Sequence, residues 1–216
     1  DTLWGEAETE ELRKAFPQLV ILRGIEVHTA TGEDIIVLGI TEPSLFYRYM
    51  EDSILAEIIE KHQGAAILAH PYRYRNAVST QSLKLPLHGV EIASSNIRQY
   101  MQAPTSRLIE KYNLRPIASS DAHWPGNIGL YGVEFPYSIA TERQLATAIR
   151  QGDFRIFMDK PRVQQINSEL EAEISLARRL MNQGYSNYEI RDLCGFSLSM
   201  LVALRANQEV NLITIP

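Results

Sequence analysis

Short apolar runs alternate with segments of helical spacing over residues 1–160. The runs 19–27 and 34–40 flank the turn-like segment 29–33 and predict a β-hairpin, which follows a strong helix-forming segment at 6–15. Alternating strands and helices of this length predict an α/β domain whose site lies at the carboxyl ends of its strands. Further strands are predicted at 65–69, 89–93, 115–118, 131–135 and 154–157, and further helices at 45–61, 106–112 and 141–151.

The pattern changes after Pro161, where apolar positions recur only at helical spacing. Three helices are expected there, and Gly184 and Gly195 stand where two of them should end. Two Ser-x-x-Glu segments, which begin at Ser168 and Ser186, predict capping boxes. We therefore expect two units, residues 1–160 and residues 161–216, with a boundary at about 160–166.

The composition narrows the class of protein. The chain has 216 residues, is 45% hydrophobic and carries a net charge of -5, so general nucleic-acid binding is not favoured. No apolar run approaches the ~18 residues of a membrane span, and the single cysteine allows no internal disulfide. We expect a cytoplasmic protein. Because residues 1–4 lack the features of a signal peptide, we also expect an internal start to the sequence.

Polar residues lie at the ends of several predicted strands. Glu26, His70, Asp121 and His123 are each at or just beyond such an end. Carboxylates and imidazoles brought to one point suit Zn, Mn or Fe, and a carboxylate can bridge two ions. Taken singly, Asp121 also fits a helix cap, His70 a core histidine and Glu26 a surface residue.

Four segments in this order resemble the PHP (polymerase and histidinol phosphatase) family of metal-dependent phosphoesterases. The resemblance covers roughly residues 1–160, and residues 1–5 also resemble the segment directly after the family's Thr-Asp-His motif. One short motif would be weak, but four in order at plausible spacing make a specific signal. The four segments are Gly24-Ile25-Glu26-Val27, Leu68-Ala69-His70-Pro71, Gly89-Val90-Glu91-Ile92 and Ser119-Ser120-Asp121-Ala122-His123.

The resemblance implies a fold and a cofactor. The fold would be a distorted (β/α)7 barrel with a small all-α, helix-turn-helix-like tail, and the cofactor two or three divalent ions of Zn, Mn or Fe. Glu26 would bridge ions, His70 would be a ligand, and Asp121 and His123 would bind different ions. Asp34 stands where many members have a histidine and would supply an oxygen ligand.

The family's His-x-His motif and the histidine of its Thr-Asp-His motif would precede residue 1, together with the first strands of the barrel. We therefore expect that the sequence is the trailing part of a longer polypeptide. His28 lies close to Glu26 but matches no ligand of the family, so a structural or supporting role is expected for it.

The implied activity is hydrolysis of a phosphate ester by a metal-activated water. The substrate would be a small phosphomonoester, a nucleotide or a nucleic-acid end. Arg73 and Arg75 are candidates to bind phosphate oxygens, although a solvated surface pair fits them equally well. Arg73 and Asp121 are the candidate catalytic residues, and Asn96 is a candidate to line the substrate pocket.

Tyr72 and Tyr74 alternate with the two arginines and could stack on a base, but exposed loop tyrosines are common. A small-molecule phosphate ester or nucleotide is the expected partner, an oligomer is an open alternative, and no membrane partner is expected.

The tail has the spacing of a helix-turn-helix over residues 186–204. Residues 161–216 hold five Arg against six Asp and Glu, so the cations that normally bind DNA phosphates are scarce. DNA recognition and packing or dimerisation both remain open for this tail. The alternative function is therefore a regulatory or DNA-binding protein whose PHP-like part senses a ligand or is inactive.

Overall fold

The computed structural model describes residues 5–215 and contains a mixed five-stranded sheet in the order β1-β2-β3-β4-β5. Its strands are β1 (Gly24–His28), β2 (Asp34–Leu38), β3 (Ala65–Leu68), β4 (Leu87–Ala93) and β5 (Pro116–Ala118). A separate pair consists of β6 (Tyr131–Glu134) and β7 (Arg155–Met158). The helices are α1 (Glu6–Ala15), α2 (Asp52–Lys61), α3 (Gln99–Tyr112), α4 (Glu142–Gln151), α5 (Lys160–Asn182), α6 (Asn187–Cys194) and α7 (Leu198–Arg205), and 3-10 turns form at Pro43–Leu45, Ser82–Lys84 and Pro125–Asn127.

The predicted barrel is wrong. β1 and β2, and then β2 and β3, pair antiparallel, whereas β3, β4 and β5 run parallel. Within residues 5–215 the five-stranded sheet is open, because β1 and β5 are its edges and β6 pairs with β7 instead. A (β/α)7 barrel needs parallel strands closed into a ring, and the tight β1–β2 turn cannot supply a parallel crossover.

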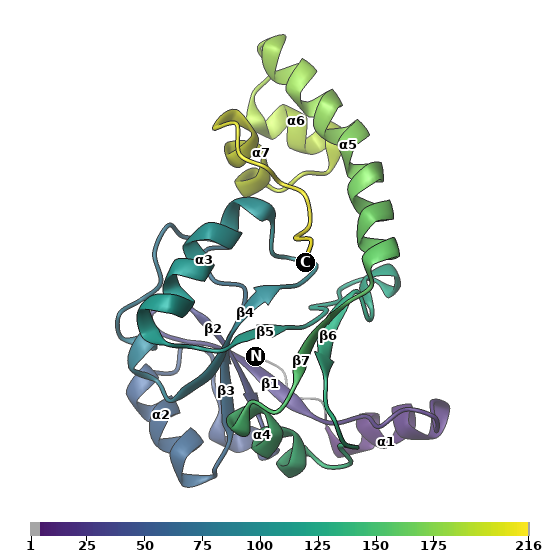
Figure 1. Ribbon diagram of the computed structural model, residues 1–216. Helices are drawn as coiled ribbons and strands as arrows, with labels where there is room; N and C mark the ends of the chain where they lie inside the picture. The colour runs from purple at the N-terminus through teal and green to yellow at the C-terminus, as the bar shows by residue number, and fades with distance from the viewer. Residues whose placement is uncertain (1–4, 216) are drawn as a thin grey trace.

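Helices cover both faces of the sheet (Figure 1). Ile35 and Val37 of β2 are buried with residues of α2 and α3, while Ile36 and Leu38 pack with Ile149 of α4. This alternation follows from the two-residue period of a strand. The result is a three-layer α/β arrangement.

Two predicted helix boundaries differ from the structure. The helix expected from residue 45 begins only at Asp52, because the backbone of Met50 pairs with Thr29 and its side chain is buried. α3 begins at Gln99, before the expected residue 106, and includes Pro104 in its second turn. Most other expected elements are confirmed within a few residues, including α1 and the hairpin of β1 and β2.

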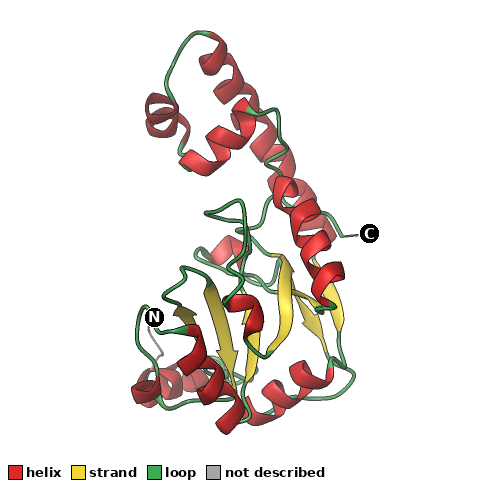
Figure 2. Ribbon diagram, turned by 90° about the vertical axis from the view of Figure 1, so that its left-hand side faces the viewer, coloured by secondary structure: helices red, strands yellow, loops and turns green. Residues whose placement is uncertain are grey.

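The long helix α5 leads away from the sheet to α6 and α7 (Figures 1 and 2). The capping box at Ser186 is confirmed, but the one at Ser168 is wrong, because Ser168 lies inside α5 and donates its hydroxyl to the carbonyl of Gln164. The segment after α7 returns to the sheet, where Leu212 is buried and the hydroxyl of Tyr131 donates to the carbonyl of Ile213 at 2.7 Å.

Within residues 5–215, no helix combines the length and apolar character needed to cross a membrane. The expected remnant of a motif at residues 1–4 lies outside the described residues.

Candidate metal centre

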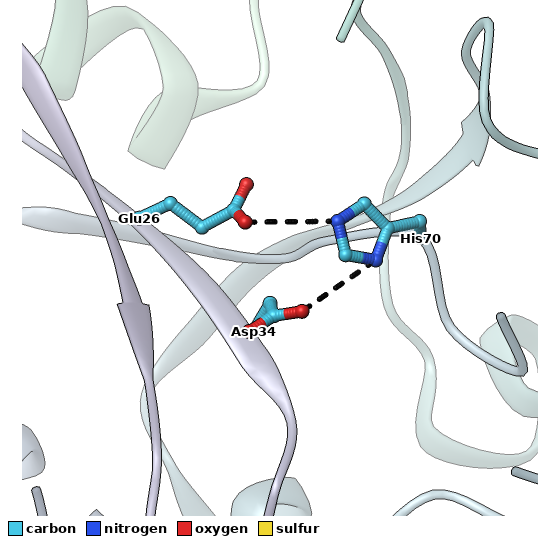
Figure 3. A group of neighbouring side chains, drawn as sticks. All are labelled: Glu26, Asp34 and His70. Atoms are coloured by element: carbon cyan, nitrogen blue, oxygen red, sulfur yellow. Dashed lines mark ion pairs between the residues drawn. The ribbon is translucent and has the colours of Figure 1, made fainter. Parts of the chain in front are cut away.

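Glu26, Asp34 and His70 come from three neighbouring strands of the sheet and meet at one point (Figure 3). His28 pairs with Asp34 in the hairpin register, and Glu26 lies two residues before His28 on the same face. His70 follows the end of β3, and the amide of Ala69 donates to the carbonyl of Asp34 at 2.9 Å, which brings the imidazole beside β2. Local strand pairing therefore determines the positions of all three side chains.

The imidazole of His70 lies between the two carboxylates. Its Nε2 is 3.7 Å from Oε1 of Glu26, and its Nδ1 is 3.9 Å from Oδ2 of Asp34. Metal–ligand bonds of about 2.0–2.2 Å allow two ligands of one ion to lie up to about 4.4 Å apart. One ligand atom from each residue lies within 4.8 Å of the others, slightly beyond this limit, so a small side-chain adjustment would let the three bind one divalent ion.

The charges of this group favour a bound cation. The approach of His70 lowers the pKa of Glu26, although burial opposes the shift. Burial lowers the pKa of His70, but the carboxylates of Glu26 and Glu91 outweigh burial, and the net pKa is raised. The negative charges of Glu26 and Glu91 thus stabilise a positive charge on the buried imidazole of His70.

His28 supports Asp34, the predicted oxygen ligand at the start of β2. Its Nδ1 lies 2.6 Å from Oδ1 of Asp34, and because a carboxylate only accepts, that nitrogen carries the proton. The ring of His28 also packs edge-on against Tyr49. The second oxygen of Asp34 remains directed at His70, so His28 orients the carboxylate without replacing it as a candidate ligand.

Glu91 belongs to one of the four segments that resemble the PHP family, but no role was predicted for it from the sequence. It is 1% exposed, it accepts a 2.9 Å hydrogen bond from the amide of His70, and it also accepts one from the hydroxyl of Ser119. Burial raises its pKa to about 7. The feature of the sequence that could have identified Glu91 is a carboxylate in the middle of an apolar strand, because buried charged residues are rare unless they are paired.

Asp121 and His123 form a second group on the loop after β5. Oδ2 of Asp121 accepts a 2.6 Å hydrogen bond from Nδ2 of Asn96 and lies 3.8 Å from Nη1 of Arg73. Nδ1 of His123 is 3.6 Å from Oδ1 of Asp121, but the His123 side chain is 64% exposed. In the part of the chain that the structure describes, only the Glu26, Asp34 and His70 group brings three metal-ligand side chains together.

Electrostatic coupling links the two groups. The charge of Arg73 contributes to the lowered pKa of Glu26, and Asp121 contributes to the raised pKa of Glu91. The geometry agrees, because Arg73 lines a small pocket together with Asp34 and His70 and lies 3.8 Å from Asp121.

Backbone strain occurs at both groups. His70 has φ of 22° and Asp121 has φ of 43°, and residues other than glycine rarely adopt such positive φ values. Such conformations cost about 1–3 kcal/mol each and concentrate at functional sites. The fold thus holds two of the predicted ligands in unfavourable conformations that aim their side chains at the site.

The arginines of the neighbourhood differ in their contacts. The guanidinium of Arg75 donates to the carbonyl of Thr31, so it is held against the turn between β1 and β2. Arg98 was not predicted from sequence; burial lowers its pKa, and repulsion from Arg73 adds to this shift. Of these arginines, Arg73 is the one that lies as close as 3.8 Å to a residue of the second group.

The comparisons with known proteins agree with the motifs. Residues 105–154 match a family model described as PHP-associated. This match supports a PHP-family relationship, as the resemblance in the sequence implied, and it includes the last of the four quoted segments. The metal binding that the resemblance implies is consistent with the Glu26, Asp34 and His70 group.

The crystal structure of PsfC from Pseudomonas syringae PB-5123 is similar in fold, with a TM-score of 0.50 and 16% sequence identity. The similarity covers 64% of this chain and 59% of PsfC, so the chain spans less than two thirds of that protein. At this identity the likeness concerns the fold alone. No curated protein matches the sequence.

Proposed function

We propose that the protein is a metal-dependent phosphoesterase that hydrolyses a phosphate ester with water. The observation that carries the proposal is the convergence of Glu26, Asp34 and His70 beside Arg73. The relationship to the PHP family supports the hydrolase class. The substrate class is a small phosphomonoester, a nucleotide or a nucleic-acid end.

The proposed cofactor is two or three divalent ions of Zn, Mn or Fe. Glu26, Asp34 and His70 would hold one ion, and Asp121 and His123 would contribute to another. Bound ions lower the pKa of water towards about 7 and neutralise phosphoryl charge.

The chain's own residues orient the reactants. The guanidinium of Arg73 offers paired donors to a phosphate oxygen at the edge of the metal centre. Asn96 fixes the carboxylate of Asp121 through its 2.6 Å hydrogen bond. Glu91 holds the backbone of His70 and thereby the direction of its imidazole.

The test is release of inorganic phosphate by the whole chain after chelator treatment and reloading with Mn²⁺ or Zn²⁺. We expect metal-dependent release from at least one ester of a broad panel. Asp121→Asn and Arg73→Ala should each lower the rate by about a hundredfold or more, since the first weakens a proposed metal ligand and the second removes a positive charge that faces the phosphoryl group.

Arg143→Ala is the matched control for Arg73→Ala, because Arg143 is an exposed arginine of α4, a helix that packs against Gly39, beyond the end of β2 that lies away from Asp34. It should leave the rate unchanged. Fully metal-loaded protein that releases no phosphate from any ester would contradict the proposal.

The DNA-binding alternative gains no support from the tail. Each arginine of α6 and α7 already contacts an acceptor in the chain: Arg191 binds Asp192, and Arg205 binds Asn187 and the carbonyl of Tyr185. DNA binding rests on cations that neutralise phosphates, so we favour the phosphoesterase.

A further inference from the structure

A cleft of about 600 Å³ lies between the loop 72–76, the start of α3 and the start of α7. Its volume is in the range of small-molecule binding sites. The three walls are far apart in sequence, and one of them belongs to the C-terminal helices. The cleft is therefore a product of the tertiary structure that joins the tail to the loop after His70.

The cleft adjoins the candidate metal centre. Arg73 lines the cleft, and its Nη1 is 3.8 Å from Oδ2 of Asp121. Tyr74 also lines it, and its ring lies edge-on to the imidazole of His70 with the centroids 6.4 Å apart. A phosphate at the metal centre would thus leave the rest of an ester directed into the cleft.

The walls of the cleft combine a cation with aromatic surface. The guanidinium of Arg73 lies 5.0 Å from the centroid of the Tyr74 ring, and the Tyr74 side chain is largely exposed. Across the cleft, Tyr100 of α3 interacts with Ser199 of α7, while Val202 presents an exposed aliphatic side chain. An exposed tyrosine beside an arginine is suited to stack on a planar ring while the cation contacts an anion.

We propose that this cleft binds the alcohol part of a phosphate ester that carries a planar ring, of the nucleoside monophosphate type. Helix α7 is then a wall of the substrate site. This assignment rests on the proposed phosphoesterase function and narrows its substrate class. Tyr74 stacks on the ring, Arg73 contacts the phosphate, and Val202 limits the width of the cleft.

The test is calorimetric binding of adenosine monophosphate to the whole chain. Val202→Trp fills the cleft from α7, and it should weaken binding about tenfold or more. Leu193→Trp is the matched control, because Leu193 is an equally exposed aliphatic residue of α6 that does not line the cleft. It should change the dissociation constant less than twofold.

A second pair of variants keeps the test decisive if Val202→Trp fails to fold. Tyr74→Ala should weaken binding about tenfold, as expected for loss of one base-stacking contact. Tyr74→Phe retains the ring and should bind within about threefold of the wild type.

Three results would overturn the cleft assignment: no binding of adenosine monophosphate by the wild type, unchanged binding in both Val202→Trp and Tyr74→Ala, or an equal loss in Leu193→Trp. Release of phosphate from any ester together with one of these results would leave the phosphoesterase proposal intact. Cleft-dependent binding without hydrolysis by the metal-loaded chain would support the cleft and contradict the phosphoesterase.

Discussion

The two groups of candidate ligands are built in different ways. Glu26 and Asp34 lie on β1 and β2, whose register is fixed by backbone hydrogen bonds. His70 lies two residues after β3 and is held by the hydrogen bonds that the amides of Ala69 and His70 donate to Asp34 and Glu91. Asp121 and His123 lie on a loop and depend on side-chain contacts such as that from Asn96. The exposure of the histidines reflects this contrast, because the side chain of His70 is 3% exposed and that of His123 is 64% exposed.

The difference teaches which part of the site is preorganised. Ligands on paired strands keep their geometry without a metal, whereas loop ligands lose more conformational freedom when they bind one. We therefore expect the strand group to bind metal more tightly and to contribute more to stability.

The largest expected effect is on metal binding. His70→Ala removes a buried ligand from the strand group and should weaken binding of Zn²⁺ or Mn²⁺ by about a hundredfold or more, because removal even of a supporting partner costs about 10–100-fold. His123→Ala should weaken binding tenfold or less. Calorimetric titration of chelator-treated protein measures both, and equal losses would show that the two groups are equally preorganised.

A smaller effect is expected on folding stability. Glu91→Ala leaves the buried amide of His70 and the hydroxyl of Ser119 without their acceptor, and should lower the free energy of unfolding by about 1–3 kcal/mol. Asn96→Ala acts on the loop group, where water can replace the amide, and should cost less than about 1 kcal/mol. Urea denaturation measures both variants, and an equal cost would contradict the comparison.

The smallest expected effect is on the pH dependence of folding stability, through His88 of β4. Nδ1 of His88 accepts a 3.1 Å hydrogen bond from the amide of Ala66 in β3, so this nitrogen must be unprotonated. Burial, together with the charges of Arg150 and Arg115, lowers the pKa of His88. The unfolded chain therefore binds a proton at His88 more readily than the folded chain does. The contribution of His88 to the free energy of unfolding is present above the ordinary histidine pKa of about 6.5 and should be lost as the pH falls below it.

The measurement is the melting temperature of the metal-free protein between about pH 7.5 and about pH 5.5, a range that spans the ordinary histidine pKa. Because the raised pKa values of Glu91 and His70 act in the opposite direction, the comparison between variants is decisive: the melting temperature of His88→Asn, which can accept the same hydrogen bond without titrating, should rise relative to that of the wild type as the pH falls. His62→Asn, at the end of α2, is the control and should keep the wild-type slope. A wild-type slope in His88→Asn would exclude His88 as the source of the effect.

Much of the local structure could be predicted from the sequence. Helix formers before Pro17 predicted α1, and the apolar runs around residues 29–33 predicted the β1–β2 hairpin. The four ordered motifs indicated the PHP relationship that residues 105–154 support. These features depend on spacing along the chain, so they are visible without knowledge of which strands pair.

The tertiary structure decided the rest. Buried apolar runs look the same in parallel, antiparallel, open and closed sheets, so the barrel was expected where an open mixed sheet forms. The role of Glu91 depends on His70 and Ser119, which approach it only when β3, β4 and β5 pair. The cleft likewise requires α7 to lie across from the loop 72–76. Sequence spacing specified the elements and the chemical types at their ends, whereas non-local pairing and packing determined which of those groups meet.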